Sequence, residues 1–229
     1  YTLFETTAFS STTGTVAVPQ NANALHVQFA VGGGSGCVMG AEYDKAGGES
    51  AGAGGASGAY ISDKVFTVTG GENLTITTGA AGAKSAGSSY NTTAGNGGTT
   101  SISGSSSGSL FSLAGGTGGS GTGGGVQGPL RSNNASVGGS ATISGTVLTS
   151  GTTLDGLNIT SFNSGPVGTF NQSGDGVAGT NPGNCGGDNC QISGGVGGAS
   201  YAGNVAGGTA GVASGATGGP GSRGSGGGG

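Results

Sequence analysis

The sequence predicts an all-β fold: a small β-sandwich-like module with glycine-rich helices of the polyproline-II type (polyglycine II) or extended runs, and essentially no α-helix. Three observations lead to this prediction. Short segments alternate apolar and polar residues, as strands do. Glycine supplies 61 of the 229 residues, and each glycine costs a helix about 1 kcal/mol relative to alanine. No segment keeps the 3.6-residue apolar period of an amphipathic helix.

The predicted strands are short and occupy the first two thirds of the chain. In residues 25–31 every second side chain is large and apolar, which predicts one shared face for Leu25, Val27, Phe29 and Val31. A strand at residues 15–18 precedes it and ends at a proline. Further strands are expected at residues 60–69, 73–77, 99–102, 110–113, 141–149 and 157–162.

Glycine runs separate these strands, at residues 32–36, 46–58, 115–128, 194–198 and 206–229. Glycine does not recur at every third position and there are only five prolines, which excludes collagen. Polyproline-II geometry has no internal hydrogen bonds, so its N–H and C=O groups must bond to water or to neighbouring segments. Glycine allows such close approach. We therefore expect packed glycine helices, with flexible linkers and irregular loops as the alternatives.

Charged residues make up only 6% of the chain, against about 25% in an ordinary soluble domain. The basic residues are far apart, so no basic stripe exists that could displace counterions from nucleic acid: Lys45, Lys64, Lys84, Arg131 and Arg223. No run of 18 apolar residues is present either. We expect neither nucleic-acid binding nor membrane insertion.

No pattern of catalytic residues emerges from the sequence. His26 is the single histidine, and it lies within the predicted strand 25–31. No glycine run is followed by the Gly-Lys-Ser/Thr of a phosphate loop, and the acidic residues lie in glycine-rich stretches that are typical of turns. We expect a protein that is not an enzyme, holds no metal and needs no cofactor.

Two of the three cysteines lie close together in the sequence. Cys185 and Cys190 flank a four-residue stretch and are a candidate disulfide, with free thiols as the alternative.

The composition predicts three segments along the chain. They are a glycine-rich β domain at residues 1–128, a second β-rich segment at 129–193 with the Cys185/Cys190 loop, and a glycine-rich extended segment at 194–229. The last is predicted to be held by backbone hydrogen bonds, because few large side chains are available there.

The order of motifs over about the first 125 residues resembles the glycine-rich domain of phage tail-fibre and receptor-binding (adhesin) proteins. Five elements carry the resemblance in order: residues 14–19 (GTVAVP), 25–34, 58–72, 74–82 and 97–116. The resemblance implies a virion tail fibre or a similar extracellular appendage that attaches to a host. Its implied partners are a host cell-surface protein or glycan, and copies of itself or other fibre proteins, a homotrimer among them.

Aromatic residues in glycine-rich, polar surroundings are the candidate binding residues. Tyr and Asn in such loops make adaptable binding surfaces. The candidate receptor-binding residues are Tyr43, Asp44, Tyr90, Asn91, Phe170 and Tyr201. Packing of each ring over neighbouring glycines is the alternative. We therefore expect a structural and adhesive module that binds a host receptor; the alternative is a self-assembling fibre, filament or coat subunit without a receptor.

Overall fold

The computed structural model describes residues 13–36, 55–84, 92–121 and 139–148, and the backbone of residues 153–154, 157–158 and 167–168. These residues form β-strands and no helix, which confirms the predicted all-β class. The longer strands are β1 (Gly14–Ala17), β2 (Ala24–Val31), β3 (Tyr60–Thr67), β4 (Asn73–Thr77), β6 (Thr100–Gly104), β7 (Gly108–Leu113) and β9 (Ala141–Ile143). The two-residue strands are β5 (Thr92–Thr93), β8 (Ser120–Gly121), β10 (Val147–Leu148), β11 (Thr153–Leu154), β12 (Leu157–Asn158) and β13 (Val167–Gly168).

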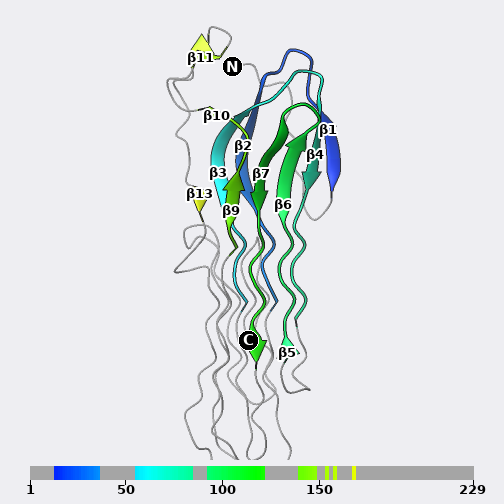
Figure 1. Ribbon diagram of the computed structural model, residues 1–229, viewed down its shortest axis with the longest axis vertical. Helices are drawn as coiled ribbons and strands as arrows, with labels where there is room; N and C mark the ends of the chain where they lie inside the picture. The colour runs from blue at the N-terminus through cyan, green and yellow to red at the C-terminus, as the bar shows by residue number, and fades with distance from the viewer. Residues whose placement is uncertain are drawn as a thin grey trace, which may run out of the picture.

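Two antiparallel sheets lie against each other at one end of the molecule (Figure 1). The five-stranded sheet has the order β1-β4-β6-β7-β9. In the four-stranded sheet, β3 pairs with β2 on one side and with β10 and β13 on the other. The remaining short strands pair as β5 with β8 and β11 with β12. The arrangement is a small β-sandwich, as the alternating strand patterns predict.

The core lies between the two sheets and takes residues from both. The rings of Phe66 in β3 and Phe111 in β7 are both fully buried, and their centroids are 5.6 Å apart with a tilted geometry. Such aromatic pairs favour offset or tilted contacts over stacked ones. The buried cluster consists of Val18, Val27, Ala59, Ile61, Phe66, Val68, Leu74, Ile102, Leu110, Phe111 and Leu113.

The predicted strand 141–149 is two strands in the structure, so that prediction was wrong. The chain leaves the five-stranded sheet after β9 and joins the four-stranded sheet as β10. Gly145 lies between them, and its N–H donates to the carbonyl oxygen of Leu110. Strands from the predicted second segment, residues 129–193, thus take part in both sheets of the sandwich.

The prediction of one shared face along residues 25–31 was also wrong. Leu25 and Val27 pack on the core, but Ala30, three residues after Val27, packs there too. Strand β3 changes face in the same way, since Ile61 and Phe66 both lie in the core. Between them Asp63 has a φ of 47°, a left-handed conformation that is uncommon outside glycine. Alternation therefore reverses near Asp63, which no period-2 pattern can foresee.

Beyond the sandwich the chain continues as glycine-rich segments with a wavy course (Figure 1). Hydrogen bonds between these segments recur at every third residue. Gly32 and Ser35 donate to the carbonyls of Ala59 and Ala56, while Gly33 and Gly36 donate to those of Gly98 and Gly95. A three-residue repeat is the period of a polyproline-II helix.

The segment 32–36 has bonded neighbours on more than two sides, which a β-strand cannot have. It is bonded to residues 55–59 and 95–98, as described above. In addition, the Gly34 carbonyl accepts a hydrogen bond from the Gly82 N–H, and the Gly33 carbonyl accepts one from the Gly116 N–H. The packed polyglycine-II interpretation is therefore confirmed for the described runs. The run 194–229, for which the same packing was predicted, lies outside the described residues.

Candidate functional site

The first candidate site is the part of the glycine bundle that lies farthest from the sandwich among the described residues. Two connections, residues 37–54 and 85–91, start and finish there. Their bordering residues lie together: the backbones of Gly55 and Gly36 are in close contact, and so are those of Gly36 and Lys84. The short pair β5–β8 joins Thr92 to Gly121 at the same end (Figure 1).

The bundle itself positions this end by hydrogen bonds rather than by a side-chain core. Gly82 donates to the carbonyl of Gly34 at 2.8 Å, and Gly95 donates to that of Ala83 at 2.8 Å. The Asn96 side chain accepts from the Gly118 N–H, also at 2.8 Å. Because each bond links different segments, the residues that border both connections are held in a fixed arrangement.

Four of the predicted receptor-binding residues belong to these two connections. Tyr43 and Asp44 lie in 37–54, and Tyr90 and Asn91 lie in 85–91, all outside the described residues. The structure brings together the points where their connections begin and end. Phe170, Tyr201, Cys185 and Cys190 also lie outside the described residues, so their predicted roles remain predictions.

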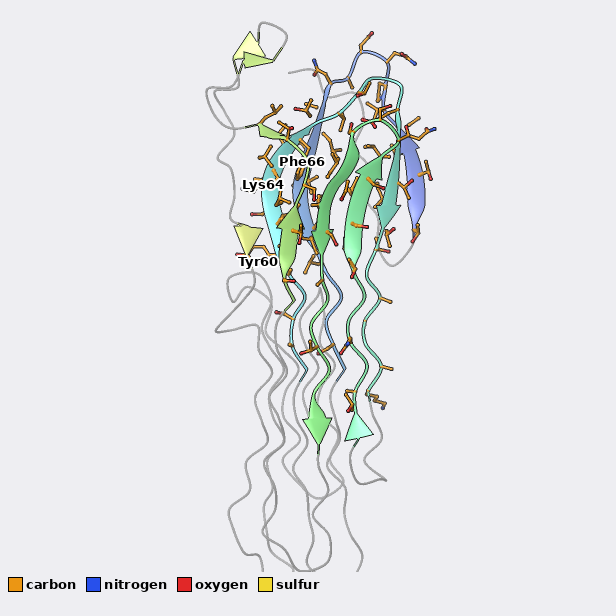
Figure 2. All side chains as sticks on the ribbon, in the orientation of Figure 1. Tyr60, Lys64 and Phe66 are labelled. Atoms are coloured by element: carbon orange, nitrogen blue, oxygen red, sulfur yellow. The ribbon has the colours of Figure 1, made fainter. Side chains whose placement is uncertain are left out.

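A second candidate is a small group of ionisable residues on β2 and β3, which the sequence analysis did not single out. His26 Nε2 lies 3.5 Å from Asp63 Oδ1, and both side chains are partly exposed. The next residue, Lys64, is buried; burial lowers the pKa of Lys64, and the Asp63 carboxylate raises it by a smaller amount. Figure 2 shows Lys64 between Tyr60 and Phe66 along β3.

Glu72 is a buried carboxylate at the end of the sandwich away from the glycine bundle. It accepts hydrogen bonds from the Thr69 N–H at 2.6 Å, from the N–H groups of Ser106 and Ser107 at 3.0 Å each, and from the Ser107 hydroxyl. Burial by itself raises the pKa of Glu72, but these donors outweigh it and lower the pKa to about 2. Glu72 thus joins the turn before β4 to the β6–β7 turn, a structural role.

The outer face of the five-stranded sheet carries hydroxyl groups in two rows across the strands. The register places Thr15, Thr75, Ser103 and Ser109 in one row, and Thr77, Ser101, Ser112 and Thr142 in the other. All eight residues are exposed or half-buried. The face has no charged and no aromatic side chain among these rows, so it offers neither ion pairs nor ring stacking.

Within the described part of the chain, no group of three or more His, Cys, Asp or Glu side chains is placed to hold a metal ion. That part also has no helix with the length and apolar character needed to cross a bilayer. No protein-family model, curated protein or solved structure matches this chain. The assignment of function therefore depends on the arrangement of its own residues.

Proposed function

We propose that this chain is the structural and adhesive module of a phage tail fibre or a similar extracellular appendage, and that it binds a receptor on the host cell surface. One observation carries the proposal. The described residues that border the two connections containing Tyr43, Asp44, Tyr90 and Asn91 lie together, and a hydrogen-bonded bundle holds them. Binding residues commonly lie on loops that a rigid scaffold positions.

The chemistry of these connections suits an adaptable contact of acidic character, since Glu42, Asp44 and Glu49 outnumber Lys45 in residues 37–54. Tyrosine supplies a large, stiff contact area, and asparagine and glycine supply adaptable hydrogen bonds. A host protein or glycan is the expected partner. The order of motifs, which resembles that of phage tail-fibre proteins, supports the same proposal. In this proposal the chain is not an enzyme and requires no cofactor.

The test is binding of the labelled, purified chain to a panel of bacterial cells and purified envelope fractions. We expect saturable binding to at least one member. The variant with both Tyr43→Ala and Tyr90→Ala should bind that member at least about tenfold more weakly, as expected when two aromatic anchors are removed. A matched control, Thr15→Ala with Thr142→Ala on the outer sheet face, should bind like the wild type. Absence of saturable binding across the panel would overturn the proposal.

A second candidate function is self-assembly into a fibre, filament or coat, favoured by the two hydroxyl rows on the outer face of the five-stranded sheet. That face lacks the charges that keep surfaces apart. Sedimentation across a range of protein concentrations separates the two candidates. Filaments whose length grows with concentration, and which Ser103→Lys and Thr75→Lys abolish, support self-assembly; a concentration-independent monomer or trimer opposes it.

A further inference from the structure

The strands and the glycine segments lie along one long axis, and the hydrogen bonds between them cross that axis (Figure 1). The segments are continuous with the strands: β2 runs into residues 32–36, residues 55–59 run into β3, and β4 runs into 78–84. Each of these described segments therefore joins its strand in the sandwich without a change of direction.

This geometry determines how the molecule responds to force. Tension along the axis slides neighbouring segments past each other, so all hydrogen bonds across an interface resist together. Tension across a sheet pulls along the bonds and separates them pair by pair. A single backbone hydrogen bond contributes little by itself, so resistance depends on how many bonds are loaded at once.

We propose that the described glycine segments carry tension along their axis into the sandwich. Their centre is the segment 32–36, which is bonded to 55–59, 95–98, 82 and 116. Load on this segment passes directly into β2, and β2 pairs with β3 from Ala24 to Val31 at every residue except Gln28. Load bearing goes beyond receptor binding, since it needs no particular receptor.

The junction between bundle and sandwich is itself bonded. The buried Thr100 hydroxyl, at the start of β6, donates to the carbonyl of Val31 and accepts from the N–H of Gly79. Val31 is the last residue of β2, before the segment 32–36, and Gly79 lies at the start of the segment 78–84 that follows β4. One side chain thus links three load-carrying segments at the same level.

Single-molecule force spectroscopy tests the proposal on the full chain, with Cys37, Cys185 and Cys190 replaced by serine. For axial pulling, handles are attached through Lys84→Cys at the far end and Ser106→Cys in the β6–β7 turn, both exposed positions. This pair shears β4 and 78–84 against β6 and 94–98. For transverse pulling, handles are attached through Thr15→Cys and Thr142→Cys on the two edge strands of the five-stranded sheet.

We expect a rupture force several-fold higher along the axis than across the sheet. The variant Thr100→Val should lower the axial force and leave the transverse force unchanged. An axial force equal to or below the transverse force overturns the proposal, and it does so in the folded wild-type background, whatever the variant does. Because no receptor is used, that outcome leaves the receptor-binding proposal untouched.

Discussion

The hydroxyl of Thr100 donates a hydrogen bond to the carbonyl oxygen of Val31 at 2.7 Å, and it accepts one from the N–H of Gly79 at 2.8 Å. The side chain is buried. It sits where the sheets end and the glycine bundle begins, so its two bonds fix the level at which separate segments change from strand to polyglycine-II geometry.

The variant Thr100→Val should therefore be clearly less stable than the wild type. Valine keeps the shape of threonine, but it leaves the half-buried Gly79 N–H and Val31 carbonyl without their partner, at a cost of about 1–3 kcal/mol. Urea denaturation measures the change. Thr99→Val, at the exposed neighbouring position, is the control and should change stability by less than about 0.5 kcal/mol. Equal effects at both positions would contradict the role of the Thr100 hydrogen bonds.

The Glu72 carboxylate predicts a specific acid sensitivity. Its pKa is lowered from 4.5 to about 2 in the folded chain. A group whose folded pKa lies below its unfolded pKa adds stability above the unfolded value, and this stability is lost as the pH falls through the folded value. The contribution of Glu72 should thus be complete above about pH 4.5 and should vanish near pH 2.

The variant Glu72→Gln isolates that contribution. At about 1.4 kcal/mol per pH unit, a shift from 4.5 to about 2 makes the variant on the order of 3 kcal/mol less stable than the wild type at pH 7. The difference should shrink between pH 4.5 and 2. Denaturation curves of both proteins at several pH values measure it. A difference that stays constant down to pH 2 would show that the lost hydrogen bonds of Glu72 do not depend on its charge.

Several elements could be predicted from the sequence because a side-chain pattern encodes them. Strand β4 has the predicted bounds, 73–77, since Leu74 and Ile76 alternate with Asn73 and the threonines between a glycine turn and a glycine run. The reversal at Asp63 and the break at Gly145 could not be predicted. Both lie at contacts with other segments: the His26 side chain of β2 lies beside Asp63, and the carbonyl of Leu110 accepts from the N–H of Gly145.

The candidate site illustrates a different limit. Its aromatic and polar residues can be recognised in the sequence. Glycine has no side chain, however, so no side-chain pattern indicates which glycine segments lie next to each other. Nothing in the sequence says that Gly36 lies beside both Gly55 and Lys84. The polyglycine-II packing could be foreseen as a class, because unpaired backbone groups must be satisfied. Which segments pair could be read only from the hydrogen bonds.

The aromatic pair between the sheets should dominate the stability of the sandwich. Phe66→Ala and Phe111→Ala each remove a fully buried ring, which costs about 3–5 kcal/mol by loss of burial and creation of a cavity. Because the two rings touch across the sheets, the double variant should lose less than the sum of the single losses, with a coupling of about 0.5–3 kcal/mol. A strictly additive double variant would contradict the contact; thermal or urea unfolding provides the measurement.

The glycine bundle gives the last prediction. A Cβ added at Gly33 would overlap the carbonyl oxygen of Ala80 and the backbone nitrogen of Gly98, which are bonded to each other at 2.7 Å. Gly33 also donates its own N–H to the carbonyl of Gly98. Gly33→Ala must therefore separate three segments, and we expect a loss of at least about 3 kcal/mol, the upper part of the range for overpacked interiors.

Gly108→Ala is the matched control for Gly33→Ala. Gly108 has a φ of 70° and no atom within 4 Å of its added Cβ, so only the backbone conformation opposes alanine, at about 1–2 kcal/mol. Hydrogen exchange then shows where each loss acts. Gly33→Ala should speed amide exchange throughout 32–36, 80–83 and 95–98 while β3 and β7 stay protected, whereas Gly108→Ala should affect the β6–β7 turn alone. If Gly33→Ala proves no more costly than Gly108→Ala, the segments are not held together by the close approach of their backbones.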